Sequence, residues 1–334
     1  LGTVYECQNK DIIEYRKASY ILGELKDINA HCDLEDERVK VYCQPVLNTR
    51  TNRFASAEAL MRLELPETGM VYPDQFIPMA ERHDYIHTLS KIILNKTCRQ
   101  IKRLEQEGYQ IDRVSVNFSI LEFRRKEFCK DVMDIIRQNE IPYEKVAIEL
   151  TESWNETEFD NIKNTITSLQ KLGIKFYLDD FGTGYSNFER IIGLPIDVIK
   201  FDRSLTILAG KNAESRYMVG SFSDIFKNSH YEILFEGVEN EKRRGSVQAD
   251  ECTVSAGLQV FQTDTDRGTD TVPGAGGVEY PVCIKTPAHP GGAEERSRAG
   301  VNCKMTTCSG WNLQAVVLIA KSGISNPHRA RHPR

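Results

Sequence analysis

Residues Lys175–Asp180 read KFYLDD, a run in which side chains of two kinds alternate before a pair of aspartates. Phe176 and Leu178 fall on one phase of the run, and Tyr177 and Asp179 fall on the other. Successive side chains of a β-strand point to opposite faces, so one phase faces a layer of helices and the other faces the interior of a curved sheet. The run therefore predicts a strand that ends in two adjacent carboxylates.

Similar runs recur between residues 39 and 239, where they alternate with helical stretches in the manner of repeated βα units. The expected strands are Val39–Val46, Ala55–Leu63, Val114–Ser119, Val146–Thr151, Lys175–Asp180, Val198–Asp202 and Ile233–Val238. The expected helices are Phe76–Glu107, Phe128–Asn139, Phe159–Leu172 and Ser215–Asn228. Seven strands in a parallel array predict an α/β fold, namely a (β/α)8 TIM-type barrel whose last βα unit is missing or scrambled.

Polar residues collect on the inward phase of these strands, late in each strand. They are Glu58, Asn117, Glu149, Asp179, Lys200 and Glu236, and Asp180 directly follows Asp179 at the end of its strand. In a TIM-type barrel the carboxyl ends of the strands form the catalytic face. The phases therefore predict that these side chains converge at one mouth of the barrel.

So many carboxylates at one mouth require cations between them. Two like charges about 4 Å apart repel by roughly 4 kcal/mol at an effective dielectric constant of about 20. Carboxylate and amide oxygens favour the hard ions Mg²⁺, Mn²⁺ or Ca²⁺, and none of the seven histidines lies on an inward phase, which argues against zinc. Because Asp179 and Asp180 are adjacent, one of them could bridge two ions, as a two-metal hydrolase requires.

The alternative for each residue is an ordinary surface role. Any one of these acids alone is better explained as a solvated side chain at a loop, and Lys200 alone as a surface lysine. Six oxygen ligands late in five strands, five of them on the same phase, are not explained in this way. Among carboxylates and metals, Lys200 becomes a candidate base or water-orienting cation.

Bulk properties narrow the class of protein. The chain has 334 residues and a formal net charge of −5, so it lacks the basic character that a nucleic-acid polymer as partner requires. It contains no apolar run long enough to span a bilayer and opens with no signal peptide, and its nine cysteines show no CxxC spacing. We expect reduced thiols and a cytoplasmic location. Because the first residue is Leu1, we expect residues 1–37 to be a helical lead-in or linker from an upstream domain that is missing here.

The polar residues and their surroundings resemble the EAL-domain family, bacterial phosphodiesterases that hydrolyse cyclic di-GMP to linear pGpG. The motif that gives the family its name stands at Glu58-Ala59-Leu60, within AEALMR. Other matching segments are YCQP at Tyr42–Pro45, PDQFIPMAE at Pro73–Glu81, SVNFS at Ser115–Ser119, IELTES at Ile148–Ser153, DDFGTGYSN at Asp179–Asn187, LPIDVIKFDRS at Leu194–Ser204 and FEGVE at Phe235–Glu239. The resemblance covers residues 38–244 and implies an EAL phosphodiesterase barrel over that range.

The resemblance also implies individual roles. It assigns metal binding, with two Mg²⁺ or Mn²⁺ ions, to Glu58, Asn117, Glu149, Asp179 and Asp180. It assigns catalysis to Lys200, Glu236 and Glu152, the last through the loop after the paired aspartates, and contact with the dinucleotide to Gln44, Leu60, Arg62 and Asp202. It implies cyclic di-GMP as ligand, a homodimer, and an upstream sensory or GGDEF-type domain. A module that senses cyclic di-GMP or binds a protein without hydrolysis is the alternative.

The family pattern breaks near Gly245. Family members continue to a last strand that carries Gln-Gly-Tyr, and its expected place here is near Ala256, where the motif is absent. Reverse translation of Ser255–Thr263 permits Leu-Gln-Gly-Tyr one base out of frame. We therefore expect the reading frame to slip near Arg244-Gly245 and residues 245–334 to be a non-homologous, disordered tail. The loss of the eighth βα unit favours inactivity of the chain as written.

Overall fold

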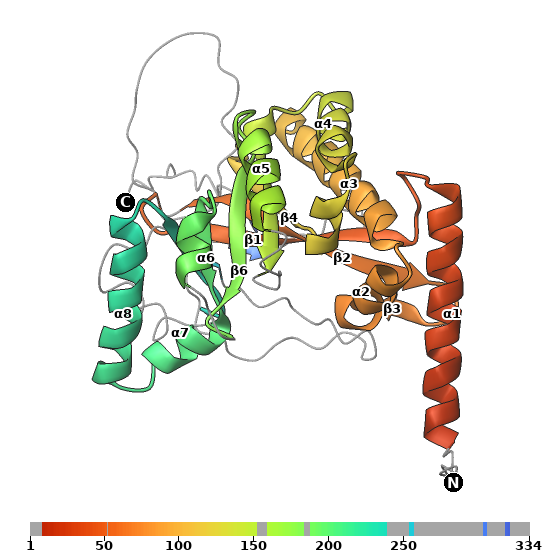
Figure 1. Ribbon diagram of the computed structural model, residues 1–334, viewed down its shortest axis with the longest axis horizontal. Helices are drawn as coiled ribbons and strands as arrows, with labels where there is room; N and C mark the ends of the chain where they lie inside the picture. Colours follow the sequence, from red (N-terminus) through yellow and green to blue (C-terminus); the bar gives the residue numbers. More distant parts are fainter. Residues whose placement is uncertain are drawn as a thin grey trace, which may run out of the picture.

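The computed structural model describes residues 9–51, 53–151, 159–183 and 188–238, and three short strands beyond them (Figure 1). Nine strands form one curled sheet, with helices on its outer side (Figure 1). The strands are β1 (Val39–Asn48), β2 (Arg53–Leu65), β3 (Gly69–Val71), β4 (Arg113–Asn117), β5 (Val146–Thr151), β6 (Lys175–Phe181), β7 (Val198–Phe201), β8 (Glu232–Phe235) and β9 (Val254–Ala256). Their order is β1-β9-β8-β7-β6-β5-β4-β2-β3, and β1 also pairs with β2, as in a partial TIM barrel.

The direction of β1 corrects the expected parallel array. β2 and β4 to β9 run parallel to one another, whereas β1 is antiparallel to both β2 and β9, and the short β3 is antiparallel to β2. Only four residues, 49–52, separate β1 from β2. A connection of that length allows a hairpin, while parallel strands need a crossover of about a dozen residues or more. Asn48 supports the turn, since its Oδ1 accepts hydrogen bonds from the backbone N–H groups of Arg50 and Thr51.

The helices mostly follow the predicted ranges. They are α1 (Asn9–His31), α2 (Pro73–Arg82), α3 (Ile86–Gln106), α4 (Phe128–Gln138), α5 (Phe159–Gln170), α6 (Phe188–Gly193), α7 (Arg203–Ala209) and α8 (Ala213–Asn228), with 3₁₀ turns η1 (Ile120–Arg124) and η2 (Tyr143–Lys145). The single helix expected over Phe76–Glu107 is wrong. The chain turns between α2 and α3 at Asp84, which has a left-handed φ of 59°.

Two apolar layers lie on the two phases of the strands. The larger core lies between the sheet and the helices and includes Phe176 and Leu178, both fully buried. A smaller cluster on the inward phase consists of Val46, Ala147, Tyr177, Val198 and Leu234. Each inward apolar residue of β5, β6, β7 and β8 is followed two positions later by a polar residue of the site. These polar residues are, in the order of the strands, Glu149, Asp179, Lys200 and Glu236. The inner cluster thus closes the barrel below the polar residues, as the alternation predicted.

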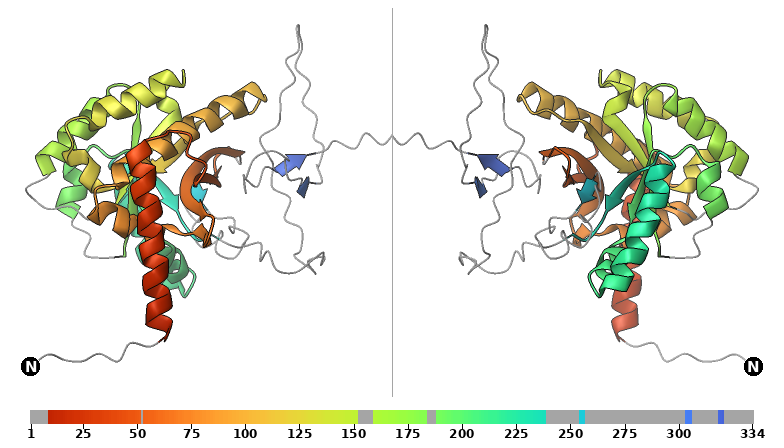
Figure 2. Two further views of the ribbon diagram at one scale, coloured as in Figure 1. Left: turned by 90° about the vertical axis from the view of Figure 1, so that its right-hand side faces the viewer. Right: turned by 90° about the vertical axis from the view of Figure 1, so that its left-hand side faces the viewer.

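The first helix rests on the barrel by its second half only. Ile21, Leu25 and Ile28 of α1 are buried in the main core, whereas Ile13 and Tyr15 are exposed. The amino-terminal end of α1 projects past the rest of the domain (Figures 1 and 2). The expected helical character of residues 1–37 is therefore seen over Asn9–His31, while their role as a linker stays a prediction.

The carboxyl-terminal region is described only at three strands. β9 lies between β8 and β1, the place of the last strand of such a barrel, but it is three residues long. β10 (Cys303–Met305) and β11 (Leu318–Ala320) pair with each other in antiparallel fashion. Apart from these strands, the expected disorder of residues 245–334 and the frame slip near Arg244 fall outside the described residues. Within the part of the chain that the structure describes, no helix combines the length and apolar character that crossing a membrane requires.

Candidate active site

A single lysine stands at the centre of the inward polar residues. β7 is buried along its whole length, and Lys200 is the one polar residue in it, with 1% of its side chain exposed. Its Nζ lies 2.6 Å from Glu149 Oε2, 2.9 Å from Asp179 Oδ1, 3.0 Å from Glu236 Oε1 and 3.2 Å from Glu58 Oε2. These acids come from β2, β5 and β6 and from the residue after β8, so the barrel brings together positions far apart in the chain.

The charges of this group do not balance. If all four carboxylates were ionised beside one ammonium group, the net charge would be −3, which is −4 plus +1. Burial and the neighbouring Glu58 raise the pKa of Glu149 well above its usual value. Burial raises the pKa of Glu236 to about 7, against the opposing effect of Lys200. Burial alone would lower the pKa of Lys200, but the surrounding carboxylates raise it well above its usual value. Lys200 therefore stays protonated, and the excess of carboxyl groups over ammonium groups favours the binding of a further cation.

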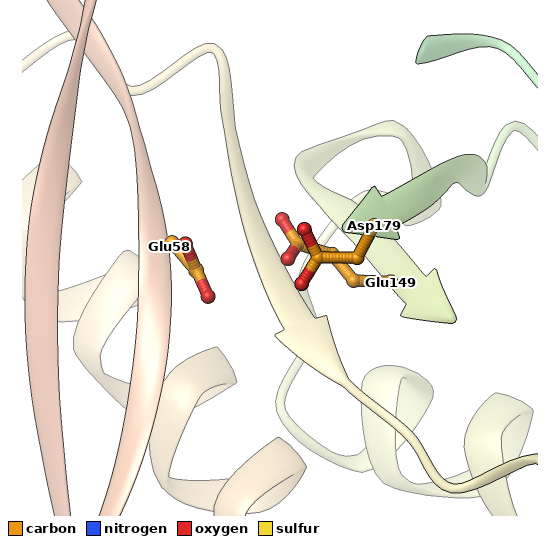
Figure 3. A group of neighbouring side chains, drawn as sticks. All are labelled: Glu58, Glu149 and Asp179. Atoms are coloured by element: carbon orange, nitrogen blue, oxygen red, sulfur yellow. The ribbon is translucent and has the colours of Figure 1, made fainter. Parts of the chain in front are cut away.

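Three of the acids offer a site for that charge. Glu58, Glu149 and Asp179 each present a carboxylate oxygen, and these oxygens lie within 4.8 Å of one another. Figure 3 shows the three carboxylates facing a common space between the strands. Glu149 Oε1 is buried and has no hydrogen-bond partner within the described structure. An oxygen-only donor set with an orphaned buried carboxylate oxygen fits a hard divalent cation.

Asn117 supports the same group from β4. Its Nδ2 donates a hydrogen bond of 2.9 Å to Glu58 Oε1. It thereby lies against one carboxylate of the acidic cluster, as the shared inward phase predicted.

Asp180 lies apart from the three clustered acids. It is exposed and has a left-handed φ of 57°, where the pairing of β6 with β7 is irregular. Its backbone N–H donates to Asp179 Oδ1 at 2.9 Å. Partial desolvation of its carboxyl group by the surrounding protein, together with the negative charge of Asp179, raises the pKa of that group. Its expected part in a second metal site stays a prediction.

A glycine after β8 allows the close approach of Glu236 to the centre. The backbone N–H of Glu236 donates to Phe201 O at 3.0 Å and so continues the alignment of β8 with β7. Gly237 follows with φ 69°, and a Cβ there would lie 2.3 Å from Arg203 Cγ. Only glycine satisfies both constraints without a shift of the neighbouring chain.

The residues expected to contact a dinucleotide lie on several different elements near this centre. In the β1–β2 ladder Gln44 is directly opposite Glu58, and Leu60 follows on the same phase. Asp202 caps α7, where its Oδ1 accepts from Ser204 N at 2.8 Å. Arg62 lies beyond Leu60 on β2, and Glu152 falls outside the described residues. Their substrate contacts stay predictions.

A supporting network behind β4 was not predicted, although its signal is in the sequence. Ser119 and Glu122 form a capping box at η1, a pattern that S-x-x-E indicates. Glu122 Oε2 accepts hydrogen bonds from Ser90 Oγ at 2.7 Å and from Ser119 N at 3.1 Å. Ser119 Oγ donates to Glu81 Oε1 at 2.6 Å. The network fixes the chain immediately after Asn117.

The chain is similar to known proteins in family, in sequence and in structure. The family described as EAL domain matches residues 28–262, a wider range than the motifs alone gave. Cyclic di-GMP phosphodiesterase PdeL of Escherichia coli is 30% identical over 213 residues, which are 63% of this chain and 58% of that protein. Cyclic di-GMP phosphodiesterase NbdA of Pseudomonas aeruginosa is 27% identical over 224 residues, 67% of this chain and 29% of that protein.

A solved structure with a similar fold also belongs to a phosphodiesterase. A structure described as PaMucR phosphodiesterase in complex with c-di-GMP has a TM-score of 0.64 and 25% identity, and the match covers 71% of this chain and 94% of that one. The chain spans about three tenths of the length of several curated relatives that it matches.

Proposed function

This chain belongs to the EAL-domain family, and from that premise we propose that it hydrolyses cyclic di-GMP to linear pGpG in a metal-dependent reaction. Two named relatives that hydrolyse this nucleotide support the substrate. The observation that carries the chemistry is the buried Lys200 among four carboxylates at the carboxyl ends of the strands, which is where barrel enzymes hold their active sites.

We propose Mg²⁺ or Mn²⁺ as the ion. Glu58, Asn117, Glu149 and Asp179 would hold a first ion, and Asp179 with Asp180 a second. When bound, such ions supply electrophilic activation of the phosphodiester and of the attacking water.

Lys200 and Glu236 have different roles in the proposed reaction. Lys200 keeps its proton because carboxylates surround it, so its role is that of a cation that orients water and offsets negative charge rather than that of a base. Glu236, whose carboxylate lies 3.0 Å from Lys200 Nζ, is the candidate group that takes a proton from water. In the net reaction the water oxygen bonds to phosphorus and the bond to a 3′ oxygen breaks, which leaves pGpG with a 5′ phosphate.

The surroundings of the site belong to the same proposal. Several relatives are more than three times as long as the matched segment, which supports a further domain, and we propose that it is an upstream sensory or GGDEF-type domain. We propose that residues 38–244 supply the enzymatic barrel of a cytoplasmic homodimer, and that among the described residues of 245–334 the strand β9 alone adds to its sheet. A module that binds cyclic di-GMP without hydrolysis is the alternative.

The experiment incubates this chain with Mn²⁺ and cyclic di-GMP, and separately with cyclic mononucleotides, and separates the products by chromatography. The break near Gly245 favoured inactivity of the chain as written, but β9 occupies the position between β8 and β1. We therefore expect pGpG from cyclic di-GMP and no turnover of the mononucleotides. Binding of cyclic di-GMP by calorimetry without pGpG formation would favour the sensing module. Equal turnover of the mononucleotides would contradict the proposed substrate.

A further inference from the structure

The guanidinium group of Arg62 lies against two tyrosine rings. Its Cζ is 5.4 Å from the centre of the Tyr72 ring and 6.0 Å from the centre of the Tyr42 ring. Both distances fall within the range of a cation–π interaction. Tyr72 is 42% exposed, while Arg62 and Tyr42 are partly buried.

The register of the strands produces this arrangement. β2 pairs with β3 so that Leu63 faces Val71, and continuing the same register by one residue places Tyr72 opposite Arg62. β1 pairs with β2 so that Tyr42 faces Leu60, which makes Tyr42 a diagonal neighbour of Arg62. Diagonal neighbours in antiparallel strands are within reach of aromatic and long side chains. One ring therefore approaches the arginine from each side of β2.

The arginine belongs to the same face as the metal centre. Arg62 shares the inward phase of β2 with Glu58 and lies four residues nearer the carboxyl end, about 13 Å along the strand at roughly 3.3 Å per residue. Nη1 donates to the carbonyl oxygen of Met61 at 2.8 Å. Glu58 and Asp74 act on Arg62 electrostatically, but within the described part of the chain no carboxylate oxygen forms an ion pair with it. Its charge thus remains available to an anionic ligand at the mouth.

We propose that Tyr42 and Tyr72 are positioning residues that hold the Arg62 guanidinium in place for a phosphate oxygen of the substrate. The inference rests on the proposed function, because it takes cyclic di-GMP as the substrate whose phosphate Arg62 meets. Two aromatic faces restrict a long, flexible side chain without competing for its N–H donors. This pair of rings, the Tyr42–Tyr72 clamp, therefore improves substrate binding and leaves the chemical step unchanged.

The test compares Tyr72→Leu with Tyr72→Phe in steady-state hydrolysis of cyclic di-GMP. We expect Tyr72→Leu to raise KM by about three- to tenfold with kcat within about twofold, and Tyr72→Phe to behave like the wild type because the ring remains. Tyr42→Leu is the second variant and shifts KM in the same direction. Tyr217→Leu, which alters an exposed tyrosine of α8, is the matched control and leaves KM unchanged.

A double-variant cycle separates positioning from a general structural effect. In an Arg62→Ala background, Tyr72→Leu produces no further rise in KM, since the group that it positions is gone. An undiminished rise in that background, or a wild-type KM in Tyr72→Leu, overturns the proposal.

A second substrate separates failure of the clamp from failure of the proposed function. Bis(4-nitrophenyl) phosphate has a single phosphate group, which the metal centre would hold, and therefore offers Arg62 no second phosphate. Its kcat/KM should stay the same in Tyr72→Leu. Turnover of this diester but not of cyclic di-GMP by the wild type contradicts the proposed substrate. Turnover of cyclic di-GMP that is insensitive to Tyr72→Leu contradicts the clamp alone. If the wild type binds without turnover, the Kd from calorimetry replaces KM, and absence of binding refutes both.

Discussion

At the scale of single residues, the feature that organises the site is the ratio of one ammonium group to four carboxylates. Lys200 and Glu149 each have 1% of the side chain exposed, so water does not screen their interaction. Removal of one partner from a buried ion pair leaves an uncompensated charge, which is far costlier than loss of a surface pair. The stability of the metal-free protein and its response to metal should therefore both depend on Lys200.

Replacement of Lys200 by Met tests this dependence. We expect the free energy of unfolding without metal to fall by about 3 to 5 kcal/mol, because the buried acids lose their counter-charge. Mg²⁺ should then raise Tm more in the variant than in the wild type, and kcat should fall by about 10²-fold or more. Lys175→Met is the control, since Lys175 pairs with Asp197 at 2.6 Å but is 39% exposed. Equal responses of Tm to Mg²⁺ in all three proteins would contradict the assignment.

Glu236 gives the metal-free protein a defined pH dependence. Its pKa is raised from 4.5 to about 7 in the folded protein, mainly by burial. The folded state therefore binds its proton more tightly than the unfolded state, and this group stabilises the fold as pH falls below 7 and loses that effect as pH rises through 7. Between about pH 8 and about pH 5 we expect the wild type to gain on the order of 2 to 3 kcal/mol relative to Glu236→Gln. Urea unfolding of both proteins measures the difference, and parallel pH profiles would refute it.

At the scale of secondary structure, the alternation of side chains along a strand correctly predicted the face on which each residue lies. It did not predict the direction of the strand. The phase of KFYLDD correctly assigned Phe176 to the outer core and Tyr177 to the inner one. Alternation is the same in parallel and antiparallel strands, so it could not reveal that β1 runs against its neighbours. The division of the expected helix over 76–107 was equally hidden, because apolar periodicity continues across it and its left-handed residue is Asp84 rather than glycine.

Some side-chain contacts of the site could likewise be predicted from the sequence, and others could not. Convergence of Glu58, Glu149 and Asp179 followed from phase and strand ends, both of which are local properties. The approach of Tyr72 to Arg62 depends on the register between β2 and β3, which no single strand encodes. Exposure of Asp180 depends on an irregular pairing of β6 with β7 that gave no warning in the sequence.

The capping box at η1 yields a prediction at this scale. Glu122→Ala removes the acceptor of Ser90 and Ser119, so we expect the free energy of unfolding to fall by about 2 kcal/mol. Glu122→Gln keeps an acceptor and should cost less. Glu127→Ala is the control, because Glu127 is exposed and its side chain makes no cap hydrogen bond. Chemical denaturation of the four proteins measures these changes, and an equal loss in Glu122→Ala and Glu127→Ala would show that the network is unimportant.

At the scale of the whole molecule, the site exists only because the sheet curls. Its acids lie between residues 58 and 236, and the strands that carry them are neighbours only in the order that the barrel imposes. The short β9 completes the circuit from β8 to β1 with three residues. We propose that this curled sheet assembles a metal-dependent phosphodiesterase from acids on separate strands.

The most direct measurement is the initial rate of pGpG formation from cyclic di-GMP, with Mn²⁺ and after its removal by a chelator, in the wild type and in Glu58→Gln. We predict turnover by the wild type that stops on chelation and returns on addition of Mn²⁺, and a rate at least about 10²-fold lower in Glu58→Gln, which replaces a carboxyl ligand with an amide. Chelator-resistant hydrolysis, or a wild-type rate in Glu58→Gln, would contradict the account.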